Sequence, residues 1–247
     1  MALHFETDDG IGTNATMGLV VLQTDETLEP EFAQIMRGDG QALYHCRIPM
    51  SPEISQDTLA KMEMDLPAAV ALLPSSLSFD VIGYGCTSAA TVIGPARVHE
   101  IIQADRPEAL VTDPLSAVIA ACHHLGARRI GFLTPYAPDV SALMQKRLED
   151  AGLEIAAFGS FEESDDRVVA RIREVDTLAA IEALSQQAEC DLFFASCTNL
   201  RVLGILQEAE RRVGKPVISS NIAMAWHMLR LAGQTQAHEG RGMLLGS

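Results

Sequence analysis

Short apolar runs alternate with segments of helical periodicity along almost the whole chain. Each run is long enough for a buried strand, and the segments between them repeat apolar residues every three or four positions, as one face of a helix does. Strands are expected near residues 17–23, 41–48, 79–84, 109–112, 129–134, 154–159, 191–195 and 216–219. Strands that alternate with helices form parallel sheets covered by helices, so the pattern predicts an α/β fold.

One predicted helix contains a proline. Leu59, Met62, Leu66, Val70 and Leu73 recur at helical spacing and form an ordinary core stripe. Pro67 lies within this stripe. Because proline has no backbone N–H, Pro67 is expected to begin a second helix or to kink the first.

One motif occurs twice, at the ends of two predicted strands. Asp80-Val-Ile-Gly-Tyr-Gly-Cys86-Thr-Ser reappears as Asp191-Leu-Phe-Phe-Ala-Ser-Cys197-Thr-Asn, with the aspartate six residues before the cysteine in both copies. Each cysteine is expected at the carboxyl end of a strand and directly before a helix, where α/β sheets place their ligands. The copies predict two similar half-domains that each offer one thiol to a shared cleft.

The repeat extends beyond this motif and divides the chain into two pseudo-symmetric halves. Gly18 and Gly131 open matching strands, and each half has a later helix that ends at a glycine, Gly126 or Gly233. The last helix is expected to cross back onto the first half. The predicted halves are residues 1–113 with 217–247 and residues 114–216, each a parallel sheet flanked by helices, with the active site between them.

The composition of the chain argues against some binding partners and indicates a cellular compartment. The 247 residues are 48% hydrophobic, and 18 basic against 33 acidic side chains give a formal charge of −15. Without a basic cluster, this charge repels nucleic acid and anionic membrane surfaces. No run approaches the roughly 20 apolar residues of a membrane span, and the amino end lacks the apolar stretch of a signal peptide. We therefore expect a cytoplasmic protein with five reduced cysteines, as a monomer or a homo-oligomer.

The sequence motifs of common cofactor and metal sites are missing. Gly83-Tyr-Gly85 has no third glycine at the dinucleotide spacing, and the chain contains no Gly-x-x-x-x-Gly-Lys loop. The seven histidines show no metal-ligand spacing, and none of the lysines follows a predicted strand. The sequence thus predicts chemistry without a metal or a cofactor.

The two repeated cysteines, Cys86 and Cys197, are the candidate catalytic residues. A thiol at a helix amino terminus lies near unpaired N–H groups, which lower its pKa from about 8.5 toward neutrality. Buried cysteines are commonly structural, but packing alone gives no reason to repeat the whole motif. Four neighbouring side chains are placed to hold a substrate carboxylate and the enediolate derived from it: Thr87, Ser88, Thr198 and Asn199.

Other residues of these segments are expected to be structural. Cys46 and Cys122 lack the setting of the repeated motif and are interpreted as core or surface residues. The repeated aspartates, Asp80 and Asp191, are interpreted as solvated residues at the starts of strands.

Four segments resemble one known superfamily. They are Gly-Tyr-Gly-Cys86-Thr-Ser, Leu-Thr-Pro-Tyr136, Ser-Cys197-Thr-Asn-Leu-Arg201 and Val-Ile-Ser-Ser-Asn221-Ile-Ala-Met-Ala-Trp-His. The likeness runs from about Gly18 to Gly233 and is to the aspartate/glutamate racemase superfamily, in its maleate cis-trans isomerase and arylmalonate decarboxylase branch. The resemblance implies two α/β halves with a cofactor-free site between them.

The resemblance also implies roles for individual residues. Cys86 matches the cysteine that attacks the double bond of maleate, and Cys197 matches its proton-exchanging partner. Tyr136 and Asn221 match positions that bind substrate. The presence of both thiols favours an isomerase or a racemase, since the decarboxylase resembles this chain only around the second cysteine.

Two departures from the family affect the expected substrate. Leu22-Gln23-Thr24-Asp25 stands where the maleate isomerases have Pro-Ser-Ser-Asn, and Asp165 and Asp166 fall near a second family asparagine. An ionised aspartate repels a carboxylate but attracts an ammonium. Asp25 thus favours an amino-acid-like or amide-bearing substrate, as in the racemase-like proteins linked to ectoine use, which carry a similar Thr-Asp-Glu-Thr. Alternatively, Asp25 only caps the helix that begins near Leu28.

The leading hypothesis is a cofactor-independent isomerase that uses two cysteines on a small carboxylate. In its cis-trans form, Cys86 adds to an alkene, the covalent intermediate rotates, and elimination gives the other isomer. In its racemase form, acting on an amino acid or N-acyl amino acid, Cys86 and Cys197 are two opposed bases. A decarboxylase and a non-catalytic small-molecule binding protein stay open as alternatives.

Overall fold

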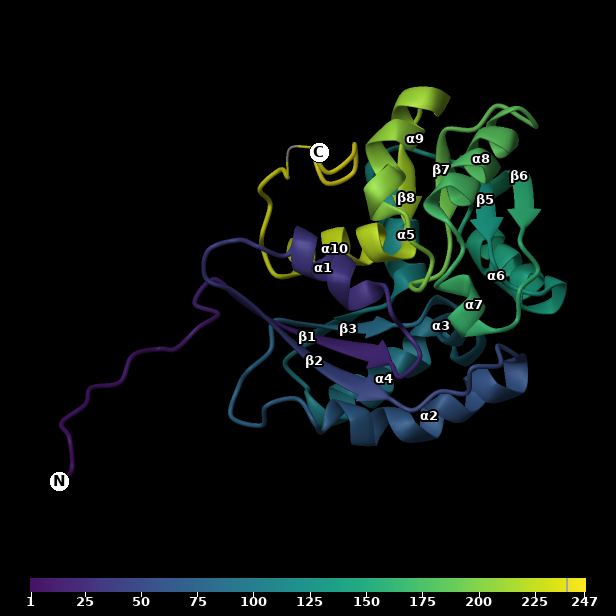
Figure 1. The fold of residues 1–247 in the computed structure, drawn as a ribbon. Helices are drawn as coiled ribbons and strands as arrows, with labels where there is room; N and C mark the ends of the chain where they lie inside the picture. Colours follow the sequence, from purple (N-terminus) through teal and green to yellow (C-terminus); the bar gives the residue numbers. More distant parts are fainter. Residues whose placement is uncertain (239) are drawn as a thin grey trace.

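Two four-stranded parallel sheets form the framework of the molecule (Figure 1). The computed structural model describes residues 1–238 and 240–247. The first sheet has the order β2-β1-β3-β4 and the second the order β6-β5-β7-β8, so the two halves share one topology. The strands are β1 (Ala15–Leu22), β2 (Gln41–Ile48), β3 (Val81–Gly85), β4 (Leu110–Thr112), β5 (Arg129–Thr134), β6 (Glu154–Ser160), β7 (Leu192–Ala195) and β8 (Val217–Ser219).

All eight predicted strands are confirmed, each within two residues at either end. Helices lie over both sheets, and α1, α5 and α10 lie between the halves (Figure 1). The helices are α1 (Leu28–Ile35), α2 (Gln56–Val70), α3 (Thr87–Ile93), α4 (Pro95–Asp105), α5 (Pro114–His124), α6 (Pro138–Asp150), α7 (Asp166–Val169), α8 (Glu174–Ser185), α9 (Leu206–Val213) and α10 (Ser220–Leu231), with the 3-10 turn η1 (Leu203–Ile205). Within the described ranges, no helix is long and apolar enough to cross a membrane.

The proline helix is one continuous element. α2 begins at the capping box of Ser55 and Thr58, runs through Pro67 and ends at Val70, so no second helix begins at the proline. Pro67 lies in the last turn, and because it has no N–H, the backbone oxygen of Glu63 loses its usual intrahelical partner. The predicted stripe is buried in the core, but its last member, Leu73, lies beyond the end of α2.

The repeated aspartates join neighbouring strands. The Oδ2 atom of Asp80 accepts a hydrogen bond from the Thr16 N–H at the start of β1, at 2.8 Å. The Oδ2 atom of Asp191 accepts from the N–H groups of Arg128 and Arg129 at the start of β5, at 2.9 and 2.8 Å. These exposed side chains are therefore more than solvated strand starts, because each one fixes the beginning of the adjacent strand.

The division of the chain requires one correction. Val217–Ser219, which the repeat assigned to the first half, pairs with β7 in the second sheet. Backbone pairing determines sheet membership, whereas the crossover begins only with the following helix. α10 then lies against α5 and against β3 and β4 of the first sheet. We therefore propose that the chain passes from the second half to the first between Ser219 and Ser220.

Candidate active site

The first cysteine connects β3 to α3. Cys86 is the N-cap residue of α3, and its Sγ atom accepts a hydrogen bond from the Ala89 N–H at 3.3 Å and lies 3.6 Å from the Ser88 hydroxyl. The preceding Gly85 allows close packing, since a β-carbon there would collide with Leu28 of α1 and the backbone oxygen of Val20. Cys86 is only 1% exposed. The predicted position, between a strand end and a helix start, is confirmed.

The second cysteine follows β7 but does not begin a helix. Cys197 has a positive φ of 99°, rare for a residue other than glycine, and a turn follows it before η1 begins at Leu203. Its N–H donates to the Ser220 hydroxyl at 3.0 Å, and its Sγ atom accepts from the Asn199 N–H at 3.4 Å. The expectation of a helix directly after Cys197 was wrong, because contacts from α10 impose this turn.

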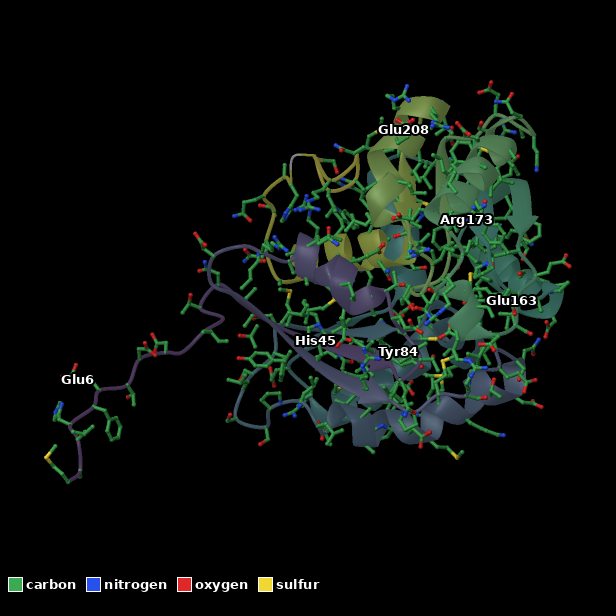
Figure 2. All side chains as sticks on the ribbon, viewed as in Figure 1. Glu6, His45, Tyr84, Glu163, Arg173 and Glu208 are labelled. Carbon is green, nitrogen blue, oxygen red and sulfur yellow. The ribbon has the colours of Figure 1, made fainter. Side chains whose placement is uncertain are left out.

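Both thiols lie in one buried polar site. The Tyr136 hydroxyl lies close to Cys197, and both thiols lie near enough to Tyr136 to raise its pKa, although burial is the largest cause. The carboxyl groups of Asp25 and Asp166 likewise act on both cysteines. The two strand ends, one from each half, therefore bring their cysteines to a common set of neighbours. Tyr84, labelled in Figure 2, lies in the core between β3 and α2.

Burial keeps both thiols protonated. Desolvation raises the pKa of Cys86 to about 12, against the opposing effect of the Ala89 N–H and the Ser88 hydroxyl. Desolvation also raises the pKa of Cys197 well above its ordinary range, and the nearby carboxyl group of Asp166 adds to this rise. The expectation that a helix amino terminus lowers the pKa of these thiols was wrong. The loss of solvation raises the pKa by more than the N–H groups at the helix end lower it.

Asp25 uses its two carboxylate oxygens differently. Its Oδ1 atom accepts hydrogen bonds from the N–H groups of Thr27 and Leu28, at 2.8 and 2.7 Å, and so caps α1. Its Oδ2 atom is buried and has no hydrogen-bond partner of good geometry within residues 1–238 and 240–247. Desolvation raises the pKa of Asp25 to about 6, although the capping N–H groups and the nearby Thr198 hydroxyl oppose the rise. Asp25 is thus both a helix cap and a free acceptor within the site.

Asn199 joins two loops from different halves. Its Oδ1 atom accepts from the Glu26 N–H at 2.9 Å, and its Nδ2 atom donates to the backbone oxygen of Asp166 at 3.0 Å. Thr24, from the same loop as Glu26, donates its hydroxyl to the Asp166 carboxylate at 2.5 Å. Asn199 is therefore in the site, but its amide holds protein backbone. Its expected role in binding substrate stays a prediction.

The other predicted residues are also buried at this junction. The Thr87 hydroxyl donates to Ser220 at 2.8 Å, and the Thr198 hydroxyl faces the backbone oxygen of Gly85 at 3.5 Å. Asn221 donates to the backbone oxygen of Thr198 at 2.8 Å. These side chains tie the two cysteine segments to each other, and their roles toward substrate stay predictions.

Two further residues of the site were missed from the sequence. Ser220 joins Thr87 to the N–H of Cys197, and its place in the Ser-Ser-Asn221 segment could have pointed to it. Glu31 of α1 accepts from the N–H groups of Val202 and Leu203 and from Asn221. Nothing in the sequence separates Glu31 from the other acidic residues of α1.

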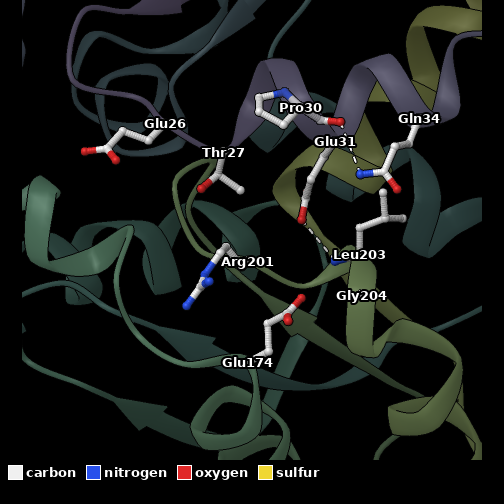
Figure 3. A pocket seen from close by; sticks show the side chains of 9 residues that line it. All are labelled: Glu26, Thr27, Pro30, Glu31, Gln34, Glu174, Arg201, Leu203 and Gly204. Atoms are coloured by element: carbon white, nitrogen blue, oxygen red, sulfur yellow. Dashed lines mark hydrogen bonds between the residues drawn. The ribbon is translucent and has the colours of Figure 1, made fainter.

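A pocket of about 250 Å³ opens between α1 and the segment after Cys197 (Figure 3). Thr27 and Glu31 line it from α1 and the preceding loop, and Arg201 and Glu174 line it from the second half. Neither cysteine lines this pocket. The pocket therefore lies beside the thiol site, and the thiols themselves are enclosed.

Two connections between the halves close the site. The Ile54 N–H donates to the backbone oxygen of Ser164 at 2.8 Å, and the Asp166 N–H donates to that of Pro52 at 3.0 Å. An exposed ion pair joins Arg171 to Glu26, with 2.8 Å between Nη1 and Oε1. One of these segments carries Asp166, whose carboxyl group acts on both thiols. In the part of the chain that the structure describes, no three His, Cys, Asp or Glu side chains are placed to hold a metal ion.

Comparison with known proteins identifies the family. The family model for arylmalonate decarboxylase matches residues 61–245. The curated maleate isomerase of Nocardia farcinica is 28% identical over 238 residues, which cover 93% of this chain and 94% of that protein.

Solved structures agree with this family in fold. The maleate isomerase of Pseudomonas putida S16 is similar with a TM-score of 0.85 at 22% identity, over 94% of this chain and 98% of that one. A mutant of the Nocardia farcinica maleate cis-trans isomerase with a covalently bound succinylcysteine intermediate has a TM-score of 0.84 at 25% identity, over 94% and 98% of the two chains. The chain belongs to the arylmalonate decarboxylase family, in the maleate isomerase and arylmalonate decarboxylase branch of the aspartate/glutamate racemase superfamily.

Proposed function

We propose that this protein is a cofactor-independent cis-trans isomerase of a small unsaturated carboxylate, with Cys86 and Cys197 as the reacting groups. The observation that carries the proposal is that the two thiols, one from each half, share Tyr136, Asp25 and Asp166 as neighbours. The similarity to maleate isomerases over nearly the whole chain supports an isomerase rather than a decarboxylase or a binding module.

The reaction follows from one nucleophile and one proton donor. As substrate enters, Cys86 loses its proton to water, and the resulting thiolate bonds to one alkene carbon while the other alkene carbon takes a proton from the Cys197 thiol. The former double bond is now single and rotates. Cys197 then takes the proton back, the carbon–sulfur bond breaks, and the double bond returns in the other geometry. Both thiols regain their initial protonation, so the cycle needs no oxidant or cofactor.

The environment of the two sulfur atoms suits them to these reaction steps. Because burial raises the pKa of each thiol, a thiolate formed in the site is a reactive base and nucleophile. The Tyr136 hydroxyl favours the ionised form of Cys197. Cys197 is thereby suited to give and retake a proton, while Cys86 carries the covalent bond.

Replacement of each cysteine tests the function. We expect Cys86→Ser and Cys197→Ser each to lower the isomerisation rate on the order of 1,000-fold or more, because each removes a reacting atom. NMR of the cis-to-trans conversion of maleate and of its monoamide measures the rate. Cys46→Ser, a buried cysteine in β2 outside the site, is the control and should keep the wild-type rate within about threefold.

Two outcomes would contradict this assignment. Retained isomerisation in both variants would exclude the thiols as reacting groups. Loss of activity in Cys197→Ser alone, together with release of CO2 from a malonate, would point to a decarboxylase. For localisation, we propose the cytoplasm, where reducing conditions keep five free cysteines as thiols.

A further inference from the structure

We propose that the substrate presents an N–H donor, an amide or an ammonium, to the Oδ2 atom of Asp25 at the end opposite its carboxylate. This inference rests on the isomerase function proposed above and concerns the substrate class of the same site. A four-carbon acid with one carboxylate and one nitrogen-bearing end fits this chemistry. A dicarboxylate does not.

The free oxygen of Asp25 is the primary observation. Asp25 is 3% exposed, and its Oδ1 atom is fixed by the N–H groups of Thr27 and Leu28. With one oxygen held, the side chain cannot turn its other oxygen away from the site. That oxygen has no hydrogen-bond partner of good geometry among the residues described, although the Thr198 hydroxyl lies near the carboxyl group, and the charge of Asp25 acts on both Cys86 and Cys197. A buried unpaired acceptor next to the reacting atoms is satisfied by a donor on the ligand.

The charges around Asp25 disfavour a second carboxylate. Asp166 of α7 and Glu31 of α1 are both buried and interact electrostatically with Asp25. Arg47 of β2 donates to the backbone oxygen of Asp25 at 3.0 Å and pairs with Glu29, so its charge is neutralised outside the site. Two carboxylates in such a poorly solvated space repel each other strongly.

The titration of Asp25 agrees with this geometry. Its raised pKa of about 6 leaves it ionised, and hence an acceptor only, at neutral pH. The other titratable groups that face it are Asp166, Glu31 and the two thiols, all with pKa values raised by burial. A bound carboxylate would force Asp25 to take up a proton, whereas an N–H donor binds the ionised form directly.

Binding of three saturated four-carbon acids at pH 8 tests the inference. Succinate, succinamate and 4-aminobutanoate share one carboxylate and end in a carboxylate, an amide and an ammonium. We expect calorimetry on the wild-type protein to show succinamate or 4-aminobutanoate bound at least tenfold more tightly than succinate. The ratio between those two separates the amide from the ammonium as the natural donor.

Asp25→Asn should reverse this order. Asparagine keeps the capping Oδ1 atom and replaces Oδ2 with an N–H2 donor, so succinate should gain at least tenfold and the nitrogen ligands should lose at least tenfold. Asp165→Asn is the matched control, because Asp165 is a neighbouring carboxylate already paired with Arg167 outside the site. The control should leave the order of the three ligands unchanged.

The outcomes separate this inference from the proposed function. Tighter binding of succinate by the wild type, or equal effects of Asp25→Asn on all three ligands, would overturn the inference. Turnover of maleate and its monoamide, followed by NMR, reports on the isomerase separately. Isomerisation with no preference for the nitrogen ligands overturns the inference alone. The binding preference with no isomerisation of either compound overturns the function and keeps the subsite.

Discussion

At the scale of one residue, the sequence around Asp25 is compatible with two roles, a helix cap and a substrate contact. Its position two residues before the Thr27 N–H identifies a helix cap, and the family asparagine at the same place identifies a substrate contact. The structure accommodates both, because one oxygen caps α1 and the other is unpaired. Sequence reasoning treats a side chain as one group, whereas the two oxygens of a carboxylate can have separate environments.

Asp25→Asn is also predicted to stabilise the protein at alkaline pH. The folded pKa of Asp25, about 6, exceeds its ordinary 3.8, so the folded state binds this proton more tightly than the unfolded state. Stability from this proton is complete below about pH 4 and is lost as the pH rises through about 6. The variant, which has no charge to bury, should gain about 1–3 kcal/mol at pH 8 and little at pH 4.

Thermal unfolding of both proteins across this pH range measures the difference. If the difference in stability between the two proteins is the same at pH 4 and pH 8, ionisation of Asp25 does not destabilise the folded protein. Asp165→Asn serves again as the control, and its difference should have the opposite sign, because its pairing with Arg167 holds the pKa of Asp165 low, at about 2.

The position of the first thiol could be predicted from the sequence, but the pKa values of the thiols could not. The motif correctly placed Cys86 at a strand end and a helix start, since both signals lie within a few residues. Its pKa depends on burial by the opposite half, which no local pattern encodes. Asp166 is a similar case, since only the folded chain brings it to Thr24 and Asn199, distant in sequence.

At the scale of elements, the strands were predictable and one helix start was not. Buried parallel strands are continuous apolar runs, so each of the eight is visible within its own residues. The segment after Cys197 has the small and polar residues of a helix start, yet Ser220 binds the Cys197 N–H and Asn199 holds the opposing loop. These distant contacts stabilise a turn with positive φ in place of a helix.

Glu31 connects α1 of the first half to the segment that carries Cys197. Its Oε1 atom accepts from the N–H groups of Val202 and Leu203 at 3.1 and 3.0 Å, and its Oε2 atom accepts from Asn221 at 2.8 Å. Glu31→Ala leaves these buried donors unpaired, so we expect a loss of about 2–4 kcal/mol in the free energy of unfolding.

Urea unfolding measures this loss, with Glu29→Ala as the control on the same helix. Glu29 pairs with Arg47 at the surface, so its removal should cost about 1 kcal/mol or less. Equal losses in the two variants would show that Glu31 does not hold the Cys197 segment.

At the scale of the whole molecule, the sequence repeat predicted the two matching sheets correctly. It placed the point at which the chain passes from one half to the other less accurately. Matching strand orders follow from matching sequences, and both sheets have them. The placement of Val217–Ser219 in the second sheet depends on pairing with β7, which a comparison of two sequence copies does not contain.

Closure of the two halves over the thiols predicts how they react with an alkylating agent. Because Cys86 and Cys197 are 1% and 4% exposed and burial raises both pKa values, they should react with iodoacetamide far more slowly than a free thiol at pH 7. Their rates should keep rising with pH up to about 10, since the pKa of Cys86 is about 12.

Mass spectrometry of peptides resolves the five cysteines in this experiment. A rate for Cys86 that levels off near pH 7 would contradict the raised pKa and indicate a thiolate at rest. Ligands that bind between the halves should slow the reaction at Cys86 and Cys197 and leave Cys122, buried in α5, unaffected.

α10 (Ser220–Leu231), which follows the last strand of the second sheet, lies against β3 and β4 of the first sheet. Protein synthesis runs from the amino terminus, so a nascent chain has made every strand of that sheet long before α10 emerges from the ribosome. Until then the apolar surface that α10 will cover stays open to solvent and to chaperones. The first sheet is therefore covered only after α10 has left the ribosome, although its own strands are the first to be made.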